Sequence, residues 1–231
     1  MMSAHKHPKL FTANIFINSH YAQILLALVF LGIVFFKPSF GFAKDAFGLN
    51  PAQVAQVKKA QKSLNSITTL EAKFIQATSR GSFARGKLWL SVPGRMRFDY
   101  DPPVEVLIVS DGSTVLFKDE ELDQLSYTTF DSTPASMLLG GAVDFFGSKI
   151  MLTDFENTDT TINITVVRED DPAEGSLTMV FETKSMMLKK WMVIDAQGIA
   201  TTVSLLDANF GARINPEFFK VEQRTMKKKA N

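Results

Sequence analysis

Apolar and polar residues alternate along most of this chain, in runs of the length of β-strands. Between residues 87 and 100, the polar or charged residues Lys87, Ser91, Arg95, Arg97 and Asp99 alternate with an apolar series formed by Leu88, Leu90, Val92, Met96, Phe98 and Tyr100. Successive side chains of a strand point to opposite faces of a sheet, so this period of two predicts strands with one buried face. Pro93 and Gly94 interrupt the series and predict the turn of a β-hairpin.

The same alternation recurs on both sides of this hairpin. Leu70, Ala72 and Phe74 alternate with Glu71 and Lys73. Turns that contain Gly or Asp separate the later runs, which is typical of antiparallel strands that follow one another along the chain. Besides the three strands named so far, the sequence predicts strands over residues 104–110, 114–118, 122–129, 161–167, 176–183, 188–195, 201–208 and 218–221.

Two helices are predicted, one before the strands and one among them. Asn50 is a suitable N-cap, Pro51 suits the first helical position, and apolar residues follow at helical spacing as far as residue 67. A second, short helix follows Pro134 and contains the apolar run Met137, Leu138 and Leu139. Together these elements predict a mainly β (α+β) fold, a long antiparallel meander with one apolar face and two short helices as its cover.

The chain is rich in the side chains that would fill this apolar face. It contains 20 phenylalanines and 10 methionines, which is a large number for a sheet covered by two short helices. Such residues at alternate positions are compatible with an ordinary hydrophobic core. An ordinary core is the more common case, but a pocket of adaptable side chains under a movable helix gives the same pattern. The alternation alone leaves both interpretations open.

The N-terminal 43 residues have the three parts of a secretory signal peptide. The start is basic and free of acidic residues, residues 24–36 form an uninterrupted apolar run, and Gly41 and Ala43 precede an expected cleavage site at Lys44. The apolar run is shorter than the about 20 residues that a membrane-spanning helix needs. We therefore expect a soluble mature protein, residues 44–231, that forms a single domain in the periplasm.

The composition of the mature part limits its chemistry. All three histidines lie in the predicted leader, and the chain has no cysteine. Without imidazoles, thiols or soft metal ligands, we expect a protein that is not an enzyme and that has no metal site or cofactor. The leader contains three of the 25 basic residues and none of the 24 acidic ones, so the mature part has a net charge of −2. This charge gives no support to a nucleic-acid partner.

Five short motifs follow one another between residues 70 and 139. They are LEAKFIQ at 70–76, GKLWL at 86–90, PGRMRF at 93–98, LIVSDG at 107–112, and STP at 132–134 followed by Leu138 and Leu139. In these motifs the chain resembles the LolA family, whose members carry lipoproteins through the periplasm to the outer membrane. The resemblance extends from about residue 50 to residue 219. It implies an incomplete antiparallel β-barrel with helices that cover the concave apolar face.

The resemblance also implies which residues form a lipid-binding site. We expect the acyl-chain cavity to be lined by Phe74, Leu88, Leu90, Met96, Phe98, Tyr100, Met137, Leu138 and Leu139. The helix that follows Pro134 corresponds to the lid of the family. Val92 occupies the position at which many members have an arginine that hydrogen-bonds to the lid and holds the cavity shut. Lid closure must therefore differ in this chain, or the lid is held by apolar contact alone.

The function implied by the resemblance is that of a monomeric carrier for acylated lipoproteins. Its partners would be an inner-membrane lipoprotein-releasing transporter complex, which supplies the cargo, and an outer-membrane receptor of similar fold, which accepts it. One alternative is an envelope sensor or lipid-binding domain of the same half-barrel fold. Another is an envelope hydrolase that uses Asp or Glu. The hydrolase requires carboxylates on the concave face, whereas the charged residues of the predicted hairpin alternate onto the opposite face.

Overall fold

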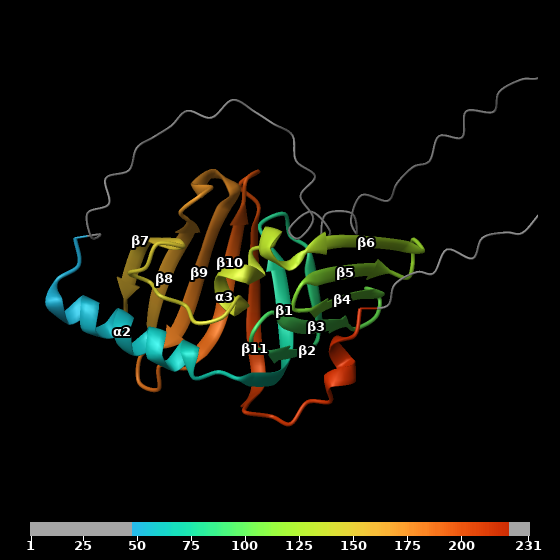
Figure 1. Ribbon diagram of the computed structural model, residues 1–231, viewed down its shortest axis with the longest axis horizontal. Helices are drawn as coiled ribbons and strands as arrows, with labels where there is room; N and C mark the ends of the chain where they lie inside the picture. Colours follow the sequence, from blue (N-terminus) through green and yellow to red (C-terminus); the bar gives the residue numbers. More distant parts are fainter. Residues whose placement is uncertain (1–47, 222–231) are drawn as a thin grey trace, which may run out of the picture.

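The structure is a computed structural model that describes residues 48–221, so the predicted signal peptide lies outside the described residues. Figure 1 shows a strongly curved sheet with short helices against it. The described elements, in chain order, are α2 (Pro51–Asn65), β1 (Thr69–Thr78), β2 (Phe83–Ser91), β3 (Arg95–Tyr100), β4 (Val106–Asp111), β5 (Thr114–Asp119), β6 (Gln124–Thr129), η1 (Phe130–Ser132), α3 (Ala135–Leu139), β7 (Ile150–Asn157), β8 (Thr161–Arg168), η2 (Pro172–Glu174), β9 (Gly175–Glu182), β10 (Leu188–Asp195), β11 (Ala200–Phe210) and η3 (Pro216–Phe219).

The strands of the described residues form one 11-stranded antiparallel sheet, in the order β6-β5-β4-β3-β2-β1-β11-β10-β9-β8-β7. Strands β1 to β6 form one meander, and β7 to β11 form a second that returns to pair β11 with β1. The predicted antiparallel sheet is confirmed. The meander is divided into two halves, because the chain crosses from edge strand β6 to edge strand β7 before the second half begins. Since these two edges do not pair, the barrel is incomplete.

The segment between these edges, residues 130–149, is called the crossing segment below. It contains η1 and α3 and passes over the sheet on the same side as α2 (Figure 1). Two side chains of α2 hold its second part. Asn65 exchanges two hydrogen bonds of 2.8 Å with the backbone of Val143, and Oε1 of Gln61 accepts one of 2.9 Å from the N–H of Phe145. The topology thus places α3 over the concave face.

Helix α2 begins as its sequence predicts. The N–H of Gln53 donates a hydrogen bond of 3.0 Å to Oδ1 of Asn50, and the N–H of Asn50 donates one of 2.9 Å to Oε1 of Gln53, which completes a capping box. Pro51 fills the first helical position. The helix buries Val57, Ala60 and Leu64 in the core of the concave side. No helix within residues 48–221 has the length and apolarity needed to cross a membrane.

Strand β7 is absent from the predicted strands for a physical reason. It is an edge strand in which only Ile150 and Phe155 are buried. Its pairing with β8 also shifts register between Leu152 and Asp154. A strand with one unpaired edge and a bulge loses the period of two by which strands are recognised in a sequence.

The predicted strand over residues 218–221 is wrong, because Pro216–Phe219 forms the 3₁₀ helix η3. Oδ1 of Asn215 accepts a hydrogen bond of 3.0 Å from the N–H of Glu217, and this cap starts a helical turn. The ring of Phe218 meets Trp89 edge to face at 5.3 Å on the convex side of the sheet. Phe219 is buried there too, so this half of the sheet has apolar packing on both faces.

Candidate functional site

The hairpin of β2 and β3 forms the floor of the concave side. Its register pairs Leu88 with Phe98 and Leu90 with Met96, and these side chains are all buried. The residues between them, such as Lys87 and Arg97, belong to the other face, where Arg97 pairs with Asp99 at 2.9 Å. The alternation in the sequence therefore assigned the two faces of this hairpin correctly.

Four aromatic rings interlock on the concave floor. The Phe74 ring packs edge to face against Phe98, at 5.3 Å between centroids, and against Tyr100, at 5.1 Å. Phe98 in turn meets Trp191 of β10 at 6.5 Å, which connects the two halves of the sheet. Gly86 on β2 makes room for this cluster, because a Cβ at that position would lie 2.9 Å from the Phe74 ring and 2.0 Å from the carbonyl oxygen of Asp99.

Helix α3 is the roof of the site. Met137, Leu138 and Leu139 are all buried and belong to the same apolar core as the floor. A backbone hydrogen bond of 2.8 Å runs from the N–H of Gly94, in the β2–β3 turn, to the carbonyl of Leu139. The C-terminal end of the lid is therefore tied to the hairpin on which it rests. Residues 130–139, which comprise η1 and α3, are called the lid below.

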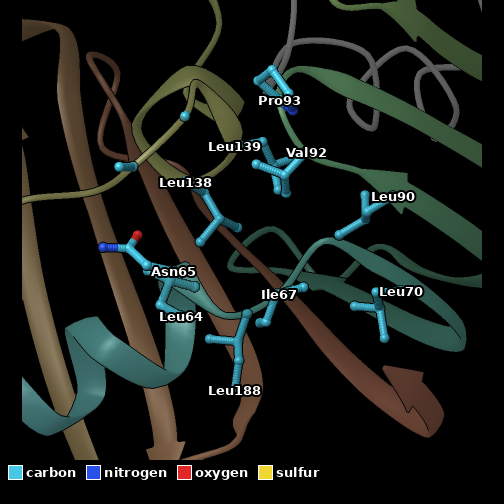
Figure 2. Close-up of a pocket in the computed structure, with 12 residues that line it drawn as sticks. Leu64, Asn65, Ile67, Leu70, Leu90, Val92, Pro93, Leu138, Leu139 and Leu188 are labelled. Carbon is cyan, nitrogen blue, oxygen red and sulfur yellow. The ribbon is translucent and has the colours of Figure 1, made fainter. Parts of the chain in front are cut away.

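Two cavities lie between lid and floor. The larger, of about 260 Å³, is bounded by the end of α2, the β2–β3 turn, the start of β10 and the lid (Figure 2). The smaller, of about 70 Å³, lies over the aromatic cluster and below Pro134 and Ala135. Both are lined by Leu90, Leu138 and Leu139, so the lid forms a wall shared by the two.

The cavity walls are almost entirely apolar. Among the described residues that line the two cavities, none is charged, and hydrogen-bonding side chains come from Asn65, Gln76, Tyr100, Trp191 and Thr201. Burial raises the pKa of Tyr100 well above its ordinary value, although the hydrogen bond to Gln76 lowers it somewhat. Such surroundings favour neutral groups. The lining also offers no carboxylate pair of the kind that a hydrolase of this architecture would use.

The volumes indicate a closed conformation. Ligand pockets usually measure about 300–1,000 Å³, whereas the two cavities measure about 260 and 70 Å³ and are separated by lid side chains. A long acyl chain does not fit either cavity without displacement of Leu138 and Leu139. Entry of such a ligand therefore requires the lid to move.

Arg168, at the end of β8, holds the lid from the far half of the sheet. Its Nη1 donates a hydrogen bond of 2.9 Å to Oγ of Ser136 in α3, and its Nη2 donates one of 2.6 Å to the carbonyl of Asp131 in η1. Its Nε lies 3.0 Å from Oε2 of Glu174. One guanidinium thus bridges both helices of the lid and a carboxylate of η2, in the fork geometry that arginine favours.

Glu174 experiences opposing effects at this position. Burial raises the pKa of its carboxyl, the charge of Arg168 lowers it, and Asp171 and Asp170 raise it, with a net upward shift. The carboxylate nevertheless orients Arg168 toward the lid, because it occupies the Nε side of the guanidinium.

Of the two alternatives for the lid, apolar contact alone is wrong, and lid closure differs through Arg168, a residue not singled out from the sequence. Ile162, Ile164 and Val166 are fully buried on the concave side, and Arg168 continues their parity by one more step. A charged residue on the apolar face of a strand was the available signal. Val92, by contrast, lies beside Leu139 in the wall of the larger cavity and contributes only apolar contact (Figure 2).

The structure brings all the predicted site residues together but gives them different positions. Leu90, Val92, Met96, Phe98, Tyr100, Pro134, Leu138 and Leu139 line one or both of the two cavities. Phe74 and Leu88 are fully buried beneath this lining and support it. Met137 lies on the side of the lid near Arg168, beside a third cavity of about 10 Å³.

The sequence of this sheet and lid matches one known family. Residues 65–222 match the family described as outer membrane lipoprotein carrier protein LolA. The chain belongs to the LolA family. As a LolA-family chain, it is 27% identical over 180 residues to the outer-membrane lipoprotein carrier protein of Chromohalobacter salexigens, covering 74% of this chain and 84% of that protein. It is 28% identical over 197 residues to the protein of the same name from Azotobacter vinelandii, covering 78% and 92% of the two chains.

A solved structure of a LolA superfamily protein from Nitrosomonas europaea is also similar to this LolA-family chain. The superposition covers 73% of this chain and 97% of the other, with a TM-score of 0.45 and 10% sequence identity.

Proposed function

We propose that this protein is a periplasmic carrier that binds the acyl chains of lipoproteins under the lid and moves them from the inner to the outer membrane. The observation that carries the proposal is the apolar, uncharged space between the β2–β3 floor and α3. Membership of the LolA family and the names of the relatives support the same role.

The physical problem of such a carrier is the cost of exposing acyl chains to water. Each methylene transferred from lipid to water costs about 0.8 kcal/mol, so a cargo with several chains does not leave a membrane unaided. An apolar cavity offers surroundings similar to those of the bilayer. Contacts through leucine, phenylalanine and methionine side chains adapt to chains of different length, because they have no directional requirement.

Release requires that the loaded state is not too stable. In the closed form the lid keeps its ties to Gly94 and Arg168. Loading breaks these contacts, and they form again when the cargo leaves, which stabilises the empty protein. If a ligand binds only the open form, its affinity is reduced by the free energy that separates the closed form from the open one. The lid ties therefore favour unloading onto a receptor without a separate energy source.

The route assigned to the protein follows from the family relationship. Cargo would come from an inner-membrane lipoprotein-releasing transporter complex and pass to an outer-membrane receptor of similar fold. Cleavage before Lys44 would release the carrier into the periplasm. Intact-mass measurement of the periplasmic protein tests this step, since a species that retains residues 24–36 contradicts the proposed export.

The direct test uses one lipoprotein in two forms. The purified mature domain is mixed with a fluorescently labelled, acylated lipoprotein in mild detergent, the detergent is removed, and soluble complexes are separated by gel filtration. The matched control is the same lipoprotein with its acylated cysteine replaced by alanine. We expect a soluble complex with the acylated form alone. Equal retention of both forms, or of neither, contradicts the carrier proposal.

A further inference from the structure

Three hydrogen-bonding side chains form a polar patch in the smaller cavity. Gln76, Tyr100 and Thr201 are 5%, 9% and 7% exposed, and all three line the cavity together with leucines and aromatic rings. Buried polar groups in an apolar wall are unfavourable unless they are hydrogen-bonded. Their partners are therefore informative about what the cavity binds.

The sheet brings these residues together across the joint between its two halves. Gln76 on β1 is directly opposite Val203 on β11, and Thr201 lies two residues before Val203. Gln76 and Thr201 are thus diagonal neighbours on one face, a spacing that long side chains bridge. Tyr100 reaches Gln76 from β3, across the small residues Ala84 and Gly86 of the intervening strand.

The hydrogen bonds of this patch are incomplete. The Tyr100 hydroxyl donates a bond of 2.8 Å to Oε1 of Gln76, which fixes the orientation of the amide. Within residues 48–221, no hydrogen bond uses the amide nitrogen of Gln76. The Thr201 hydroxyl is fully buried and has no hydrogen-bond partner among these residues. An amide N–H₂, which can only donate, and a hydroxyl, which can donate or accept, are thus left free on two residues that line an otherwise apolar space.

We propose that Thr201 and Gln76 bind the carbonyl oxygen of an acyl ester or acyl amide, so that the cavity recognises the linkage of a lipid as well as its chain. This inference rests on the proposed function, because it places acyl chains in this cavity. The amide N–H₂ and the hydroxyl can both donate to one carbonyl oxygen, which accepts two hydrogen bonds. An orphaned hydroxyl costs free energy in the closed state, and a bound carbonyl removes that cost.

The lack of charged residues in the described lining further limits the class of ligand that the cavity can bind. The described lining contains no lysine or arginine, so the carboxylate of a free fatty acid would be buried without a countercharge. Burial also keeps the pKa of Tyr100 high, which shows that the same surroundings disfavour an anion. The patch therefore selects neutral, esterified or amide-linked chains against free fatty acids.

The position of the patch gives the bound lipid a direction. Thr201 pairs with Thr78, next to the β1–β2 turn, whereas the larger cavity lies at the opposite end near Val92. A chain held by its carbonyl at Thr201 would extend under Leu138 toward the larger cavity. The glycerol and polypeptide of the cargo would leave past the β1–β2 and β10–β11 turns.

The experiment compares two ligands that differ in one carbonyl group. A 1-monoacylglycerol and a 1-O-alkylglycerol of equal chain length displace an apolar fluorescent dye from wild type, Thr201→Val and Thr201→Ser. We expect Thr201→Val to weaken the ester about five- to tenfold, which corresponds to one lost hydrogen bond, and to leave the ether unchanged. Thr201→Ser keeps the hydroxyl and should retain ester binding. Gln76→Met should act in the same direction as Thr201→Val.

Each outcome is decisive. The Thr201→Val protein should fold as well as wild type, because the substitution removes a buried hydroxyl that has no partner. If Thr201→Val weakens ester and ether equally, or changes neither, the carbonyl site is wrong while the cavity itself stands. If wild type binds neither ligand, the proposed carrier function fails together with this inference. Preference of wild type for a free fatty acid over the ester would also overturn it.

Discussion

Nη1 of Arg168 lies 2.9 Å from Oγ of Ser136, so a residue of β8 is bonded directly to the helix that roofs the cavity. Ser136 belongs to the crossing segment between β6 and β7, whereas Arg168 belongs to β8 in the second half of the sheet. Because the same guanidinium also bonds to η1, it restrains the whole lid rather than one end of it.

Replacement of Arg168 should loosen the lid. Arg168→Gln removes charge-assisted hydrogen bonds worth about 1–2 kcal/mol, a range that allows for the partial exposure of the side chain. We expect faster amide hydrogen exchange in α3, by roughly fivefold to thirtyfold, and tighter binding of an apolar dye. The matched control is Arg85→Gln, since Arg85 forms an exposed ion pair with Asp101 at 3.7 Å, away from the lid. Unchanged exchange in α3 would show that the apolar contacts alone hold the lid.

Substitution at Val92 should have the opposite effect. Val92 borders the larger cavity beside Leu139, so Val92→Arg places a donor near the carbonyls at the end of the lid. One added hydrogen bond of about 1 kcal/mol in the closed form makes binding to the open form weaker by the same amount, which is about fivefold. Dye affinity and exchange across α3 measure both sides of this linkage. Val92→Met, which keeps the position apolar, should change neither by as much.

A charge on the concave floor should abolish ligand binding. Phe98→Glu places a carboxylate among apolar side chains, at a cost of several kcal/mol to the ionised form. We expect this variant to lose binding of both apolar dye and acylated lipoprotein. Circular dichroism checks that it is still folded. Lys87→Glu is the control, because Lys87 is exposed on the convex face opposite Lys73. Equal binding by both variants would rule out the assigned floor.

Acid should remove the stabilisation that Asp111 gives to the β4–β5 turn. Burial raises the pKa of this carboxyl, but hydrogen bonds from the backbone of Thr114 and Ser113 and from the Ser113 hydroxyl outweigh it, and the pKa is lowered. A lowered folded-state pKa gives stability above the unfolded value of about 3.9 that is lost as pH falls through the folded value. Wild type and Asp111→Asn should therefore differ most in unfolding free energy at neutral pH and converge in strong acid.

A control at the neighbouring turn separates this effect from general acid unfolding. Asp123→Asn changes the same functional group at the β5–β6 turn. Thermal unfolding of the three proteins between about pH 2 and 7 should show convergence with wild type for Asp111→Asn alone. A difference that stays constant with pH would contradict the assigned cause.

Alternation in the sequence predicts local features, such as which side chains of a strand share a face. The faces of β2 and β3 follow from it, because a pleated strand turns each side chain to the other side. The start of the lid at Pro134 and of α2 at Asn50 follows from local capping chemistry. The crossing from β6 to β7 cannot be predicted in this way, since no local feature of the sequence indicates which distant strand pairs with β1.

The residues that act across the cavity share a feature of the sequence: each is a polar residue at a position where the alternation calls for an apolar one. Gln76 continues the buried parity of Leu70 and Phe74, and Arg168 continues that of Ile164 and Val166. A polar group on the apolar face of a strand needs a partner. Which partner it finds, whether Tyr100 or the lid, is decided by the three-dimensional register and cannot be read from a single strand.

The pairing of β1 with β11 has a consequence for how the protein matures. Within each half, every strand pairs with the next strand along the chain. The β1–β11 pair, by contrast, joins strands from opposite ends of the described chain. Contacts between distant segments form late in folding, because a long loop must close first. Gln76 and Thr201 stand on the two sides of the joint. Until this joint forms, the residues of β1 and β11 that line the smaller cavity are apart, so the cavity exists only in the fully joined sheet.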